Sequence, residues 1–194
     1  MVFRIIPDNI FQSTMLAHFV KSNFNNNNVF VIFDKDEYGT ELANTFIQSL
    51  KRMKITTVKK WGFTSGLTET PNELNRITTE LTLKYNSGVV FIATHGAEAI
   101  KLITSLKYPT SKFTILGPDS FSSFSFINSF NDYPRERAKM GYYTDNIYTV
   151  VSSLYNIQNS KTHAFNCAYK KFTKNIHPLF QVHITMPYLL LRIQ

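Results

Sequence analysis

An apolar run that ends in charged and aromatic residues carries the clearest chemical potential in this 194-residue chain. Val29 to Phe33 leads into Asp34, Asp36 and Tyr38. A phenol hydroxyl donates and accepts hydrogen bonds, whereas a carboxylate accepts them or pairs with a cation. If the apolar run is a strand of an open α/β sheet, these groups stand at its carboxyl end, where such sheets bind ligands.

Two further polar residues follow later apolar runs. His95 comes after the run 89–93, and Asp119 comes after the run 113–116. Parallel strands end at one edge of a sheet, so Tyr38, His95 and Asp119 are expected to line one ligand crevice. There Asp119 could accept a hydrogen bond from an ammonium group, and His95 could donate or accept. In the structural alternative, Asp119 caps a turn, Tyr38 packs on the sheet edge and His95 begins a helix.

Motifs typical of enzymes are missing from the sequence. It has no G-x-S-x-G elbow, no P-loop, no G-x-G-x-x-G after a strand and no histidines at metal-binding spacing. Asp34 and Asp36 could suggest a magnesium or phosphoryl-transfer site, but no partner carboxylate or lysine motif supports one. Cys167 has a helical context, in which a lone cysteine is most often a small buried hydrophobe. We therefore expect a binding protein rather than an enzyme, without a cofactor.

Apolar periodicity predicts the elements that position these residues. Strands are expected at residues 29–33, 55–61, 89–93 and 113–116, and helices at residues 9–21, 38–53, 71–84 and 97–106. Pro71 suits the first turn of its helix. This alternation predicts a three-layer α/β domain with a parallel sheet and crossover helices.

The pattern is less regular in the C-terminal third. Residues 120–130 are rich in serine and phenylalanine, a further strand is expected at 147–154, and a last helix is expected at 162–174. We expect one α/β domain over residues 1–194 that is irregular from residue 121 onward.

The chain has a formal net charge of +8, from 21 lysines and arginines against 13 acidic residues. Such a charge raises the question of an anionic partner, such as nucleic acid or a lipid surface. The basic residues form short, scattered clusters, which are typical of solvated helix faces. No RRM, zinc-finger or helix-turn-helix signature accompanies them, which argues against nucleic acid.

The sequence gives few indications of compartment. Cys167 is the only cysteine, so no intrachain disulfide can form. Residues 1–8 lack the basic and apolar regions of a secretory signal, which favours a cytoplasmic chain or one from which a leader has been removed. No stretch approaches the ~20 apolar residues of a membrane helix.

Three stretches together resemble the type I periplasmic binding proteins, specifically the branched-chain amino acid binding proteins of ABC importers and related receptor ligand-binding regions. They are Phe3-Arg4-Ile5-Ile6-Pro7 with Gln12, Val31 to Gly39, and Leu116 to Ser120. Their order and spacing agree over residues 3–120, and residues 140–143 and 164–172 are similar to the later part of that family.

The resemblance implies one lobe of a Venus-flytrap protein, in which two α/β lobes close on a small ligand, usually an amino acid. It places Tyr38 and His95 where relatives have aromatic ligand contacts, and Asp119 where an acidic residue pairs with the α-ammonium of the ligand. The commoner residue there is glutamate, so Asp119 reaches one methylene less far. The resemblance also implies a periplasmic location and the membrane subunits of an ABC importer as partners.

In relatives, a first lobe that helps to hold the ligand carboxylate precedes the matching region, so this chain is expected to be chiefly the second lobe. The first interpretation is a solute-binding component, or a truncated remnant, of an amino acid importer that binds a small polar ligand. The alternative is a protein-interaction module, or a lobe that forms homo-oligomers, that has lost solute binding. Residues 121–130 and the apolar tail 187–191 motivate this alternative, because exposed apolar patches mark interfaces.

Overall fold

The computed structural model describes residues 8–24, 27–151, 164, 167, 168, 171 and 190–193. The strands are β1 (Val29–Asp34), β2 (Thr57–Phe63), β3 (Ser87–Ala93), β4 (Lys112–Gly117), β5 (Ile147–Val150) and β6 (Leu190–Ile193). The longer helices are α1 (Asn9–Asn23), α2 (Glu37–Arg52), α3 (Thr70–Lys84) and α4 (Gly96–Leu106). Short helical segments follow β4: η1 (Asp119–Ser122), α5 (Phe124–Asn128), η2 (Ser129–Asp132) and α6 (Pro134–Ala138).

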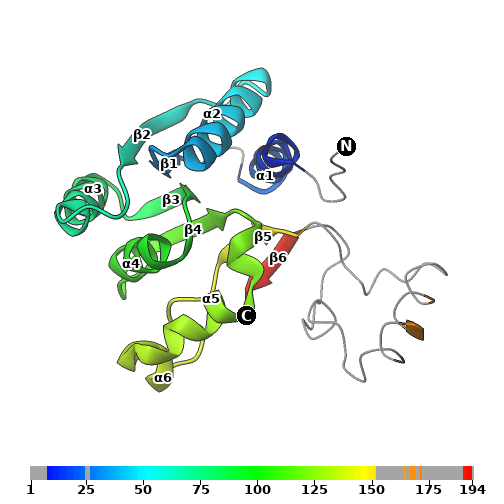
Figure 1. Cartoon of the computed structure of the whole chain (residues 1–194). Helices are drawn as coiled ribbons and strands as arrows, with labels where there is room; N and C mark the ends of the chain where they lie inside the picture. The colour runs from blue at the N-terminus through cyan, green and yellow to red at the C-terminus, as the bar shows by residue number, and fades with distance from the viewer. Residues whose placement is uncertain are drawn as a thin grey trace.

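The six strands form one sheet in the order β2-β1-β3-β4-β5-β6 (Figure 1). All pairs from β2 to β5 are parallel, whereas β6 is antiparallel to β5. The chain starts in the sheet at β1, moves outward to β2, and returns to the other side of β1 at β3. The winding direction therefore reverses between β1 and β3. The predicted parallel α/β sheet is confirmed, and β6 is an addition that the sequence pattern did not predict.

Helices cover both faces of the sheet, as Figure 1 shows. Val29 and Val31 of β1 pack in a core with α1 and α2, whereas Phe30 and Ile32 pack in a second core with α3 and α4. Successive side chains of a strand point to opposite faces, so a strand buried on both faces must be apolar at every position. This requirement explains the unbroken apolar run of β1.

β2 begins two residues later than the sequence pattern predicted. Ile55 was expected to start the strand, but its amide donates to the carbonyl of Leu50 at 2.9 Å. The turn that follows α2 includes Lys54, which has a positive φ of 63°. Ile55 thus closes the turn after α2, and the apolar side chain is buried there rather than in the strand.

The serine- and phenylalanine-rich segment is not the exposed apolar patch that its composition suggested. Phe121, Phe126 and Phe130 are at most 5% exposed, and the rings of Phe121 and Phe126 stack with centroids 4.3 Å apart. Phe124 is the phenylalanine of this segment that reaches solvent, with 42% of its surface exposed. Of the apolar tail 187–191, residues 190 and 191 are described, and their backbone lies in β6, which pairs with β5.

Two other predictions fall partly outside the described residues. β5 ends at Val150, and residues 152–154 of the expected strand are not described. The expected helix 162–174 is described at four positions, all of them helical. One of these is Cys167, which is exposed, so the expectation of a buried cysteine is wrong.

Candidate functional site

The candidate site lies at the carboxyl ends of β1 and β3, where the sheet changes its winding direction. The chain leaves β1 for α2 on one face and leaves β3 for α4 on the other. Connections that diverge in this way open a crevice beside the strand ends, which is the usual ligand position in open α/β sheets.

Tyr38 and His95 come from these two connections and stack on each other. Their ring centroids are 4.2 Å apart and the ring planes are inclined by 13°. Tyr38 is half-buried and His95 is exposed, so the stack presents an aromatic surface to solvent. The structure therefore brings together two residues that the sequence placed at separate strand ends.

The first turn of α2 holds Tyr38 in place. Asp36 caps this helix, since its carboxylate accepts a hydrogen bond from the amide of Gly39 at 2.6 Å. Gly39 lies directly on the strand ends, because a Cβ at this position would be 2.5 Å from the carbonyl oxygen of Asp34 and 2.7 Å from that of Ala93. Only a residue without a side chain permits this approach of α2 to the sheet.

His95 occupies the N-cap position of α4, but its side chain makes no capping hydrogen bond. The structural alternative for this residue, a helix start, is thus correct for its backbone. Its imidazole ring is used instead in the stack with Tyr38.

Asp119 follows β4 and approaches the same site. Its backbone amide donates to the side-chain oxygen of Gln12 in α1 at 3.2 Å, which holds the loop against the first helix. The short helix η1 begins at Asp119 without any side-chain cap, so the expected capping role of its carboxylate is not observed. The carboxylate is half-exposed and close enough to Tyr38 to act on it electrostatically.

The environment of Tyr38 keeps its hydroxyl protonated. Burial raises the pKa of Tyr38 far above its ordinary value, and the negative charges of Asp119 and Asp36 raise it further. A hydrogen-bonding interaction with Ser120 acts in the opposite direction on this pKa. The phenol therefore remains a neutral donor and acceptor at every physiological pH.

Ser120 is a member of the site that the sequence analysis did not select. Its hydroxyl oxygen is buried, and it lies close enough to the Tyr38 hydroxyl to lower the pKa of that phenol. Buried hydroxyls are normally hydrogen-bonded. The signal available in the sequence was the position of Ser120 directly after Asp119, at the end of a predicted strand.

Asp34 and Asp36 have structural roles. Asp34 is buried and accepts a hydrogen bond from the amide of Ser65 at 3.3 Å, whereas Asp36 caps α2. Within the described ranges, no group of three or more histidine, cysteine or acidic residues is arranged to hold a metal ion. In the same part of the chain, no helix is long and apolar enough to cross a membrane.

Neither a family model nor a curated protein matches this sequence, but solved structures share its fold. An ABC transporter solute-binding protein from R. palustris, in complex with benzoate, has a TM-score of 0.63 and 19% identity over 92% of this chain and 45% of its own length. A leucine-binding protein from Thermotoga maritima has a TM-score of 0.61 and 18% identity, over 90% of this chain and 46% of its own.

A structure from Rhodospirillum rubrum, described as a branched-chain amino acid ABC transporter, has a TM-score of 0.66 and 16% identity over 91% of this chain. This chain spans less than half the length of each of these three proteins. At such identities the similarity shows the fold alone. It confirms the lobe of the type I periplasmic binding fold that the sequence resemblance implied.

Proposed function

We propose that this chain is the second lobe of a solute-binding protein of an ABC importer, and that it binds a small ammonium-bearing solute, an amino acid in the first instance. The observation that carries the proposal is the Tyr38 and His95 stack at the switch point of the sheet, with Asp119 beside it. A periplasmic location and docking to importer membrane subunits belong to the same proposal.

Each residue has a physical role in this proposal. The carboxylate of Asp119 pairs with the ammonium group of the solute. The stacked rings of Tyr38 and His95 provide a flat apolar surface for the solute's side chain. The Ser120 hydroxyl, which is buried next to Tyr38, helps to orient the phenol toward the solute.

The choice of solute class rests on charge. Structures that share this fold contain benzoate, leucine or 3,4-dihydroxybenzoic acid, so the fold does not select among these ligands. Benzoate has a carboxylate but no ammonium group, and the negative charge of Asp119 would repel it. Leucine carries the ammonium group that Asp119 can pair with, which favours amino acids over aromatic acids for this chain.

Differential scanning fluorimetry of the full chain tests the proposal with four matched compounds. Leucine carries both charged groups, leucinamide only the ammonium group, 4-methylpentanoate only the carboxylate, and benzoate an aromatic ring with a carboxylate. Leucine and leucinamide should raise the melting temperature in a concentration-dependent way, because a ligand that binds only the folded state stabilises it by mass action. The two carboxylates without ammonium should leave it unchanged.

Two outcomes would contradict this proposal. A larger shift with 4-methylpentanoate than with leucinamide would mean that Asp119 does not select the solute. A flat response to every amino acid and amide, in a protein that unfolds cooperatively, would mean that this lobe does not bind solute by itself.

The self-association alternative loses its first support, since Phe121, Phe126 and Phe130 lie in the core.

A further inference from the structure

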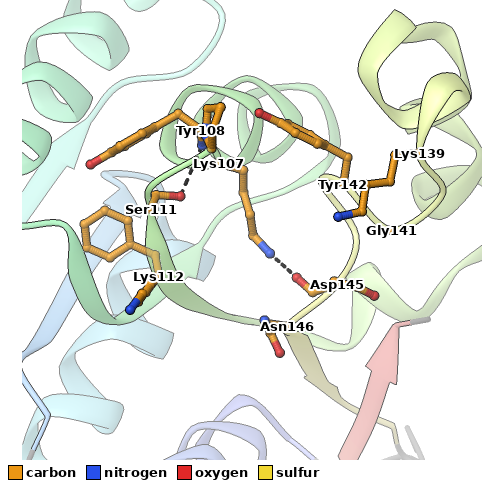
Figure 2. A pocket seen from close by; sticks show the side chains of 11 residues that line it. Lys107, Tyr108, Ser111, Lys112, Lys139, Gly141, Tyr142, Asp145 and Asn146 are labelled. Atoms are coloured by element: carbon orange, nitrogen blue, oxygen red, sulfur yellow. Dashed lines mark hydrogen bonds between the residues drawn. The ribbon is translucent and has the colours of Figure 1, made fainter.

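A hollow lies at the amino ends of the strands, on the opposite side of the sheet's strand ends from Tyr38. It has a volume of about 290 Å³ and is lined by residues from the end of α4, the start of β4 and the loop before β5 (Figure 2). The amino ends of β4 and β5 meet at this edge, whereas the solute site described above uses the carboxyl ends of the strands. The two sites are therefore separate.

Basic side chains from three segments line this hollow. Lys107 follows α4, Lys112 begins β4 and Lys139 follows α6. Asp145 contributes the one carboxylate of the lining, which leaves a net charge of +2 from three lysines and one aspartate. Lys112 and Lys139 are exposed at the rim, so their ammonium groups are available to a bound anion.

Lys107 forms part of the inner wall. Its exposed fraction is only 8%, and its ammonium group donates a hydrogen bond to the backbone carbonyl of Asp145. In Figure 2 its side chain runs between the two halves of the lining toward Asp145. Lys107 therefore places a positive charge on the inner wall, next to the lining residue Asp145.

Two tyrosines complete the wall. Tyr142 accepts a hydrogen bond from the guanidinium of Arg135 at 3.2 Å, so its own hydroxyl hydrogen can point elsewhere. Tyr108 is held next to the hollow, because its amide donates to the hydroxyl of Ser111 at 3.1 Å. Aromatic surfaces beside basic groups suit an anion that carries a ring or another flat organic part.

We propose that this hollow binds a small phosphate-bearing anion. Lysine ammonium groups act as point charges toward phosphate, and a dianion matches the net charge of the lining. The volume is close to the lower end of small-molecule sites, about 300 Å³, which suits a compact ligand and not a macromolecule. The proposal does not depend on solute binding at Tyr38.

Isothermal titration calorimetry on the full chain tests this proposal with pyrophosphate, AMP and adenosine at constant ionic strength. The matched variants are Lys112→Ala with Lys139→Ala, which removes two exposed lysines of the hollow, and Lys51→Ala with Lys60→Ala, which removes two exposed lysines elsewhere. Both double variants lower the net charge equally, so non-specific attraction affects them alike.

Pyrophosphate and AMP should bind the unmodified chain, and adenosine should not. The hollow variant should lose at least about tenfold in affinity, since each charge-assisted hydrogen bond contributes strongly, while the control should stay within about twofold. Equal losses in both variants would overturn the proposal, as would no binding of either phosphate compound at millimolar concentration. Leucine should bind both double variants as it binds the unmodified chain, so failure of one site is distinguishable from failure of the other.

Discussion

The side chain of Gln12 accepts a hydrogen bond from the backbone amide of Asp119 at 3.2 Å, and this bond joins two positions 107 residues apart. Gln12 is only 4% exposed and Asp119 is half-exposed, so the loss of Gln12 leaves the Asp119 amide without this partner in a partly buried position. A buried donor without a partner costs about 1–3 kcal/mol. We expect Gln12→Ala to lower the free energy of unfolding by about 1–2 kcal/mol in urea denaturation.

Asn9→Ala is the matched control for Gln12→Ala on the same helix. Its side chain donates to Glu41, but this hydrogen bond is exposed to solvent. Exposed substitutions usually change stability by less than about 0.5 kcal/mol. If both variants lose the same stability, the hydrogen bond between Gln12 and Asp119 does not hold the loop.

Asp119→Asn should abolish recognition of the ammonium group without unfolding the protein. The residue is half-exposed and makes no cap with its side chain, so its carboxylate is not needed for the fold. Loss of a charge-assisted hydrogen bond should weaken leucine and leucinamide binding by about tenfold or more. Titration calorimetry of both ligands measures this, and unchanged affinity would exclude Asp119 from the solute site.

Tyr38 should make stability depend on pH only in the alkaline range. Its pKa in the folded protein is raised above the ordinary value of 10.0, mainly by burial. Below the ordinary pKa of 10.0 the phenol is protonated in both the folded and the unfolded chain, so the contribution of Tyr38 to stability is complete. Above it the unfolded chain loses the phenol proton while the folded chain keeps it, so stability falls as pH rises.

Tyr38→Phe removes this dependence but keeps the aromatic ring that stacks on His95. Urea denaturation between about pH 8 and about pH 11 should show a steeper loss of stability for the unmodified chain than for the variant. Asp119→Asn should give an intermediate slope, because it removes a negative charge that raises the pKa of Tyr38. Parallel curves for the unmodified chain and Tyr38→Phe would show that the phenol titrates alike in both states.

Glu136→Gln should destabilise the loop that leads into β5. The carboxylate of Glu136 is buried and accepts hydrogen bonds from the amides of Gly141 and Tyr143, at 2.7 and 2.6 Å, and from the hydroxyl of Thr144 at 2.8 Å. A glutamine would place an NH₂ group where an acceptor is needed. We expect a loss of about 1–3 kcal/mol in the free energy of unfolding.

Glu69→Gln is the control for Glu136→Gln. Glu69 is exposed, and its described side-chain hydrogen bond is to the hydroxyl of its neighbour Thr68. Its replacement should change stability by less than about 0.5 kcal/mol. A loss as small for Glu136→Gln would mean that the loop does not depend on this carboxylate.

Local sequence patterns were sufficient to predict the main elements of the fold. The run Val29 to Phe33 is apolar at every position because both of its faces are covered, and this property can be read without the tertiary structure. The same holds for Pro71, which lies in the first turn of α3 as expected. The start of β2 was predicted two residues too early because the apolar side chain of Ile55 is buried in a turn. A buried apolar residue in a turn looks, in the sequence, like a residue of the adjoining strand.

The site was predicted only as a set of strand ends. Tyr38, His95 and Asp119 each follow an apolar run, and parallel strands bring their carboxyl ends to one edge. That Tyr38 stacks on His95 depends on β1 and β3 being neighbours in the sheet. The order of strands is not encoded in any local pattern, because the same alternation of strands and helices is compatible with several orders.

The sequence by itself determined the fold class and the residue types at the strand ends, since burial and periodicity are properties of neighbouring residues. The tertiary structure alone decided that Phe121, Phe126 and Phe130 lie in the core, that β6 joins the sheet, and that the Ser120 hydroxyl faces Tyr38. It also brought Lys107, Lys112 and Lys139 around one hollow. These arrangements arise from contacts between segments far apart in the chain, and such contacts form only when the sheet and both helical layers are assembled.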